Sequence, residues 1–66
     1  MEENERSGLL TTSEVAVRLR VNPSTVRRWR LDDVGPRYLR MGGIYRYPAD
    51  QLEEWISESV RHSIAS

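Results

Sequence analysis

The 66-residue sequence contains no cysteine, no lysine and no long apolar run. Without cysteine it can form neither a disulfide nor a thiolate zinc site, which fits a reducing, intracellular location. A membrane-spanning helix needs about 20 apolar residues, and a secretory signal needs an apolar segment soon after Met1; the sequence has neither. A chain this short forms one domain and buries only about 60% of its unfolded surface, which leaves no room for an enclosed catalytic pocket.

Groups that could catalyse a reaction or bind a metal are also scarce. His62 is the only histidine, and one histidine without cysteine does not make a zinc site. Three glutamates, at positions 53, 54 and 58, fall outside the apolar stripe of a predicted amphipathic helix, so we interpret them as a solvated face. We therefore predict no enzymatic activity, no metal and no cofactor.

The arginines are concentrated in the middle of the chain. Residues 18–46 carry eight arginines and two aspartates, a net charge of +6, whereas residues 1–17 and 47–66 each carry −3. Such asymmetry is typical of a site for a polyanion. The planar guanidinium group also suits two-point binding of phosphate or of a guanine edge. The alternative is a solvated surface with scattered charges.

Two helices separated by a very short turn are predicted near the N-terminus. After a short extended segment at Leu9–Leu10, the first helix runs from about Ser13 to Leu19 with Thr12 as its N-cap. The second runs from Pro23 to about Asp32, with Asn22 as its N-cap. Because so few residues separate them, the two helices must cross steeply, as in a helix-turn-helix unit.

The second helix has an apolar side and a polar side. Val26 and Trp29 are its inward residues, and the opposite side carries Ser24, Arg27, Arg28 and Leu31. A short helix with arginines on its exposed face suits the DNA major groove. The alternative is that both arginines pair with Asp32 or are simply solvated.

A β-hairpin is predicted around Gly42–Gly43. We favour a three-residue loop, Gly42–Ile44, because it sorts apolar from charged side chains across the two strands. This register places Met41 opposite Tyr45, Leu39 opposite Tyr47, and Arg40 opposite Arg46.

A third helix, from about Ala49 to Ser59, follows Pro48. The fold class is thus mainly α with a small β-hairpin, a winged helix-turn-helix over residues 9–59. A disordered acidic tail (1–8) precedes it and a fraying tail (60–66) follows. The predicted core, which includes both tryptophans, comprises Val15, Ala16, Leu19, Val26, Trp29, Leu39, Met41, Tyr45, Leu52, Trp55 and Ile56.

Two stretches of the sequence resemble one group of DNA-binding proteins. The first is LLTTSEVAVRLRVNPSTVRRW, which resembles the helix-turn-helix opening of the MerR-like superfamily. The second is GPRYLRMGGIYRYPADQLEEWI, which is similar to the wing and closing helix of phage excisionases and their AlpA-type relatives. The resemblance covers Leu10 to Ile56. It implies a winged helix whose second helix enters the major groove and whose wing lies over the backbone or the minor groove.

The resemblance also assigns candidate DNA-binding residues. The recognition-helix positions match Ser24, Thr25, Arg27 and Arg28, and the wing positions match Arg40, Gly42, Gly43 and Arg46. Arg30 stands where a core aliphatic residue is common, so we expect either that the second helix packs less tightly or that Arg30 contacts phosphate. Arg20 stands where the family often has a turn glycine, and Ile44 replaces a frequent wing-tip arginine.

The function that this resemblance implies is that of an excisionase, or recombination directionality factor. Such a protein binds beside integrase sites, bends the DNA and favours excision of a prophage. The expected partners are double-stranded DNA, a phage integrase and neighbouring copies of the protein on DNA, in the cytoplasm and nucleoid of a bacterial host. The arginine-only composition is compatible with a phage of a GC-rich host such as a mycobacterium. Alternatives are a small AlpA-type transcriptional regulator and a protein-interaction module that docks an acidic partner on its basic face.

Overall fold

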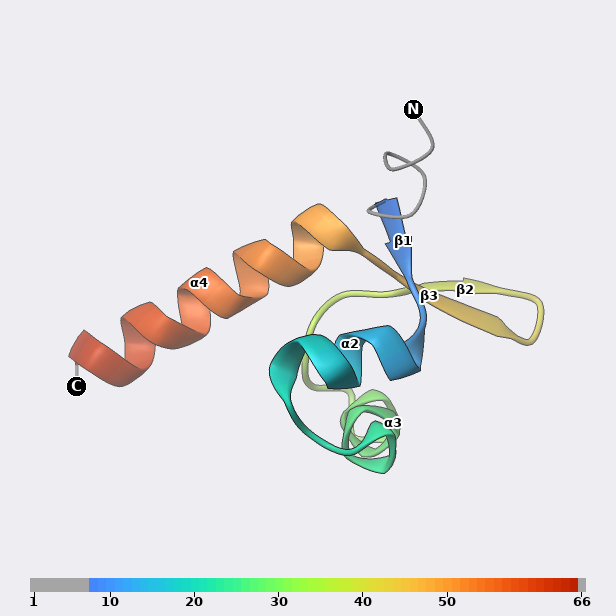
Figure 1. Ribbon diagram of the computed structural model, residues 1–66, viewed down its shortest axis with the longest axis horizontal. Coiled ribbons are helices and arrows are strands. Elements are labelled where there is room, and N and C mark those ends of the chain that lie inside the picture. Colours follow the sequence, from blue (N-terminus) through green and yellow to red (C-terminus); the bar gives the residue numbers. More distant parts are fainter. Residues whose placement is uncertain (1–7, 66) are drawn as a thin grey trace.

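The computed structural model describes residues 8–65, with side chains for residues 8–63. Its elements, in chain order, are β1 (Leu9–Leu10), α2 (Thr12–Leu19), α3 (Pro23–Leu31), β2 (Leu39–Met41), β3 (Ile44–Pro48) and α4 (Ala49–Ala65). Figure 1 shows α2 and α3 crossing on one side of a small sheet, while the hairpin of β2 and β3 projects away from the helices. This is the winged helix-turn-helix that the sequence predicts. None of the described helices is long and apolar enough to cross a membrane.

Helix α2 begins one residue earlier than expected, because its N-cap is Thr11 and not Thr12. The Thr11 hydroxyl accepts a hydrogen bond from the Glu14 backbone N–H (3.1 Å), and the Glu14 carboxylate accepts one from the Thr11 N–H (2.8 Å). This reciprocal capping box needs Glu or Gln three residues after the cap, which Thr11 has and Thr12 does not. The Thr12 hydroxyl is thereby left to contact another part of the fold.

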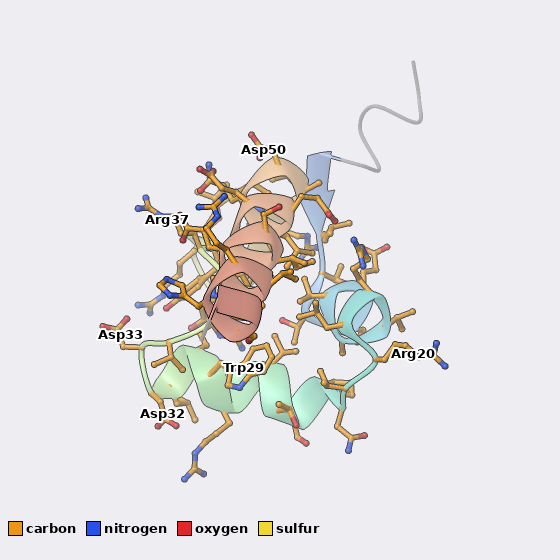
Figure 2. All side chains as sticks on the ribbon, turned by 90° about the vertical axis from the view of Figure 1, so that its left-hand side faces the viewer. Arg20, Trp29, Asp32, Asp33, Arg37 and Asp50 are labelled. Carbon is orange, nitrogen blue, oxygen red and sulfur yellow. The ribbon has the colours of Figure 1, made fainter. Side chains whose placement is uncertain are left out.

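The turn between α2 and α3 is closed by backbone hydrogen bonds around Arg20. The Val21 N–H donates to the Ala16 carbonyl (2.9 Å), and the Arg20 N–H donates to the Val17 carbonyl (3.2 Å). These two bonds form a Schellman motif, which requires a left-handed residue; Arg20 has φ 62°. A side chain in this conformation costs about 1–2 kcal/mol, which explains why glycine is frequent there. Figure 2 shows the Arg20 side chain pointing away from the rest of the molecule.

The register predicted for the hairpin is wrong by one residue. The observed loop has two residues, Gly42 and Gly43, and the paired residues are Leu39 with Arg46, Arg40 with Tyr45, and Met41 with Ile44. Gly42 has φ 64° and Gly43 has no positive φ, as in a type II′ turn, the turn that suits a two-residue hairpin. A three-residue loop would instead have asked β-branched Ile44 to take a positive φ. Arg40 and Arg46 therefore do not face each other.

This change of register reverses the faces of β2 relative to β3, since one residue of slip moves the side chains of that strand to the other side. Tyr47 is 1% exposed and belongs to the core, and Tyr38 packs against that core. Leu39 and Met41, which we expected inside, are exposed, while Tyr45 is half-buried. Strand β1 pairs with the other edge of β3, with Leu10 opposite Tyr47, so the sheet has the order β1-β3-β2.

The observed core contains Leu10, Tyr38 and Tyr47 in place of the predicted Leu39, Met41 and Tyr45. Its fully buried hydrophobic residues are Val15, Ala16, Val26, Tyr47 and Leu52, and the side chains packed against them are Leu10, Leu19, Trp29, Tyr38, Trp55 and Ile56. The rings of Trp29 and Trp55 lie 5.6 Å apart, so both tryptophans join α3 to α4 and neither is a free stacking surface. Gly35 lies against Trp29, where a Cβ would come within 3.0 Å of the tryptophan Cβ.

Helix α4 continues to Ala65 and does not end near Ser59 as expected. Arg18 on α2 holds its first half through two hydrogen bonds to the Glu53 carboxylate, at 2.9 and 3.1 Å. The later turns extend away from the body (Figure 1). Fraying of residues 60–66 stays a prediction, and the predicted acidic tail, apart from Gly8, lies outside the described residues.

Candidate nucleic-acid interface

The exposed side of α3 carries arginines and no acidic residue before Asp32. Ser24, Arg27 and Arg28 are exposed, whereas Thr25 is half-buried. The side chain of Arg27 makes no hydrogen bond or ion pair with any residue between 8 and 65. Arg28 lies 3.3 Å from the Asp32 carboxylate, an exposed pair. Because Arg27 needs to break no contact to meet a polyanion, this face is suited to bind one.

This face forms because α3 has a narrow apolar side. Val26 is fully buried and Trp29 packs against the core, so the residues about half a turn away must point outward. Pro23 occupies the first helical position, where its missing N–H is not needed. Helical periodicity alone therefore predicts which residues of α3 are exposed.

Arg30 differs from the other arginines of α3, because its guanidinium group turns inward. It donates hydrogen bonds to the Thr12 hydroxyl and to the Tyr47 hydroxyl, both at 3.1 Å. Its central carbon lies 3.9 Å from the centre of the Tyr45 ring, within the range of a cation–π contact. The half-buried side chain thus ties α3 to the start of α2 and to β3. The predicted contact of Arg30 with phosphate stays untested, but these contacts make it a positioning residue first.

The two wing arginines lie on opposite faces of the hairpin. Arg40 is exposed and, in the observed register, shares a face with Tyr45. Arg46 is half-buried, and its guanidinium donates a hydrogen bond to the Tyr45 carbonyl at 2.8 Å. Both remain free of acidic partners among the described residues. The wing can therefore present positive charge on each side.

The outer face of the sheet is apolar, a feature that our sequence analysis missed. Leu9, Leu39, Met41 and Ile44 are all exposed there. The signal was present in the sequence: a two-residue loop places Met41 opposite Ile44 and Leu39 on the same side. We set that register aside because it mixes apolar and charged residues.

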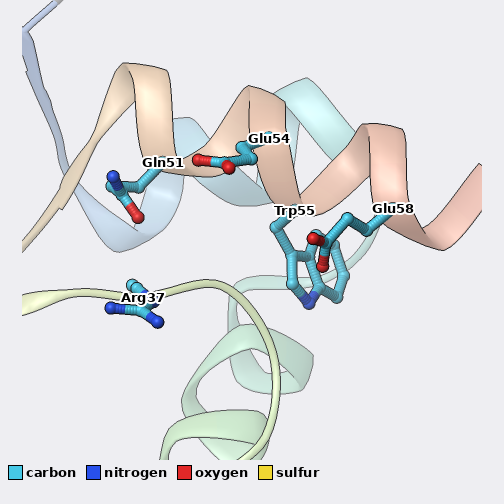
Figure 3. Close-up of a pocket in the computed structure, with 5 residues that line it drawn as sticks. All are labelled: Arg37, Gln51, Glu54, Trp55 and Glu58. Atoms are coloured by element: carbon cyan, nitrogen blue, oxygen red, sulfur yellow. The ribbon is translucent and has the colours of Figure 1, made fainter.

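A shallow pocket of about 310 Å³ lies away from this surface, between α4 and the loop before β2. Figure 3 shows Arg37 from the loop facing residues of α4, and the lining consists of Arg37, Gln51, Glu54, Trp55 and Glu58. Two carboxylates and one guanidinium make it acidic on balance, so it does not suit a polyanion. Within residues 8–65 no three His, Cys, Asp or Glu side chains gather closely enough to hold a metal ion.

Comparison with protein families gives a match that covers most of the chain. The family model described as a helix-turn-helix domain matches residues 9–59, from β1 to the middle of α4. The match includes every candidate residue of α3 and the wing. No curated protein matches the chain.

Proposed function

The chain belongs to the helix-turn-helix domain family, a DNA-binding family that includes excisionase-like and AlpA-like proteins, and on this basis we propose that it is a DNA-bending excisionase. In this role it directs an integrase toward excision of a prophage. The observation that carries the DNA-binding part is the exposed face of α3, where Arg27 and Arg28 stand without an acidic residue before Asp32.

The two arginines of α3 fit the major groove. A bidentate contact from arginine to the O6 and N7 atoms of guanine is the commonest specific contact in that groove. Ser24 and Thr25 lie one turn earlier, at the N-terminal end of α3. In recognition helices this end usually contacts the base edges. We assign sequence discrimination to this group of four residues.

The wing fits the sugar–phosphate backbone beside the same groove. Arg40 and Arg46 supply charge, and the Gly42–Gly43 turn presents no side chain that would keep the backbone away. No other group lies within 4 Å of where a Cβ would stand at either glycine. We assign affinity that is independent of sequence to the wing.

Salt dependence tests DNA binding itself. Release of counterions from DNA makes the logarithm of the binding constant fall by about 0.9 per phosphate contact for each tenfold rise in salt. We expect the chain to bind any duplex with a steep slope, and one selected sequence at least a thousandfold more tightly. A protein-interaction module with a basic face would bind duplexes weakly and without such preference.

Bending separates an excisionase from an AlpA-type regulator. An excisionase must deform DNA so that distant integrase sites meet. We expect several clustered sites at an attachment region, occupied by neighbouring copies of the protein, and a bend visible by circular permutation of the probe. An effect on integrase-mediated excision in the presence of the purified chain completes the test. One unbent promoter site and no effect on excision would favour the regulator.

A further inference from the structure

The tip of the wing carries an exposed apolar pair, Met41 and Ile44, that takes no part in packing the hydrophobic core. Their side chains are 46% and 52% exposed, and neither belongs to the core or packs against it. They are the last strand residues on either side of the Gly42–Gly43 turn and lie directly opposite each other. Two large apolar side chains at the most distant point of a hairpin are costly to leave in water.

The shape of the tip is narrow. Paired strands lie about 4.8 Å apart, and directly opposite residues project their Cβ atoms to the same side of the hairpin. Beyond Met41 and Ile44 the chain has only two glycines, with nothing within 4 Å of either Cβ position. The wing therefore ends in a narrow tip with one apolar face. The minor groove of B-DNA, about 6 Å wide, must open to admit this tip, as it does where inserted side chains unstack a base step and kink the duplex toward the major groove.

The charges around this tip indicate its occupant. From Val34 to Ala49 the sequence has three arginines and no acidic residue. Arg46 lies on the same face as Met41 and Ile44, and Arg40 lies on the other. An apolar tip on a segment whose charged residues are all arginine matches a ligand that has both apolar stacked surfaces and a polyanionic frame, which is duplex DNA.

We propose that Met41 and Ile44 form an apolar wedge that enters the minor groove and partly unstacks one base step. Met and Ile are among the side chains that kink DNA in this way, by 20–90° toward the major groove. The wedge rests on the proposed DNA binding and adds the means by which the chain bends its site: the arginines hold the backbone while the apolar pair opens the stack.

Fluorescence of 2-aminopurine tests the wedge directly, because this base brightens when it is unstacked. The probe is a duplex with one site selected from random sequence by the full chain, with 2-aminopurine placed at successive steps, and bending is measured on the same site. The test variant is Met41→Ser with Ile44→Ser. Val60→Ser on α4 is the matched control, since Val60 is 48% exposed and remote from the wing. Met41→Leu with Ile44→Leu keeps the apolar character.

We expect the wild-type chain and the Val60→Ser control to brighten one step and to bend the probe. The double serine variant should lose most of both signals and bind on the order of tenfold more weakly, whereas the double leucine variant retains them. Thermal unfolding checks that all variants fold. A double serine variant that still unstacks and bends the site overturns the wedge, and so does a loss confined to cooperative binding of several copies, which would make the tip a contact between copies. If the wild-type chain binds duplexes but brightens no step, the wedge fails alone; if it binds no duplex, the proposed function fails with it.

Discussion

Helix α3 and the wing both present an outward face to the proposed DNA, but charged side chains dominate the first face and apolar side chains the second. The face of α3 bears the charged side chains of Arg27 and Arg28 beside exposed Leu31, while Val26 and Trp29 turn inward. The outer face of the wing bears exposed apolar side chains and half-buried Arg46. Hydrogen-bonding groups suit base edges, and an apolar surface suits base faces. Two neighbouring elements of one small domain can thus use different parts of the same duplex.

One side chain connects α3 with the inner face of the wing. Arg30 leaves α3, contacts the ring of Tyr45 and donates to the hydroxyl of Tyr47, both on β3. The geometry between the helix and the wing therefore depends on contacts that neither element makes by itself. Substitutions at different positions can separate the contributions of the helix, of the wing and of the Arg30 contacts that link them.

The largest effect is expected when the link is removed. Arg30→Met should lower the free energy of unfolding by about 2–3 kcal/mol, since it deletes two hydrogen bonds of about 1 kcal/mol each and a cation–π contact. Chemical denaturation followed by circular dichroism measures this. Arg27→Met, at an exposed arginine of the same helix, is the control and should change stability by less than about 0.5 kcal/mol. Equal stability of the two variants would show that the contacts of Arg30 do not contribute to the free energy of unfolding.

The next effect separates the DNA roles of the helix and the wing. Arg27→Ala or Arg28→Ala should cost about 1–3 kcal/mol on the selected duplex and relax preference at one base pair. Arg40→Ala or Arg46→Ala should weaken selected and scrambled duplexes equally, and should reduce the salt slope by about 0.9. Binding isotherms over a salt series measure both quantities, with Arg61→Ala on α4 as the control.

This division of roles between helix and wing is wrong if the wing arginines prove to set sequence preference and the helix arginines only affinity. It is also wrong if none of the four substitutions changes binding, because the arginines would then be a solvated face. Since Arg40 is opposite Tyr45 and not Arg46, no gain in stability from relief of charge repulsion is expected on replacing it.

A smaller effect is expected at the turn of the wing. Gly42 has φ 64°, so Gly42→Ala should lower stability by about 1–2 kcal/mol. Gly43 has no positive φ and open space at its Cβ position, so Gly43→Ala is the matched control and should be tolerated. For a domain of this size 1 kcal/mol corresponds to about 4–8 °C in Tm, which thermal unfolding resolves. Equal losses at both glycines would argue against the type II′ turn.

The helices and the wing also differ in how much of them could be predicted from sequence. Helix starts and apolar spacing are local signals, so the course of α3 and the exposure of Arg27 and Arg28 could be predicted. Strand register is not local. We assumed that Leu39 and Met41 must be buried, whereas the inward face of the sheet belongs to tyrosines whose hydroxyl and ring meet Arg30.

Arg30 shows why this part could not be predicted. The sequence marked it as an unusual residue at a core position, but its partners at positions 12, 45 and 47 come together only in the folded chain. Without them, the guanidinium group had no visible reason to turn inward, and contact with phosphate was the natural interpretation. The same contacts bear on the hairpin register. Without them, the register that separates apolar from charged side chains was the better choice, although it is the wrong one.

The smallest effect is expected at Asp32, and it decides whether Arg28 serves the helix or the DNA. The Arg28–Asp32 pair is exposed, and an i,i+4 pair with the basic residue first is the less favourable orientation. An acidic residue at the C-terminal end of a helix is also unfavourable toward the helix dipole. Asp32→Asn should therefore change stability by less than about 0.5 kcal/mol.

The same substitution should strengthen binding to duplex DNA by about two- to threefold at low salt, because it removes a negative charge beside Arg28. Glu58→Gln makes the same change of charge on α4, outside the reading face of α3, and should have less effect on binding. The gain should vanish in an Arg28→Ala background if Arg28 is the group that Asp32 restrains. A loss of stability with no gain in affinity would instead make the pair a structural contact and would leave Arg27 as the main reading arginine of α3.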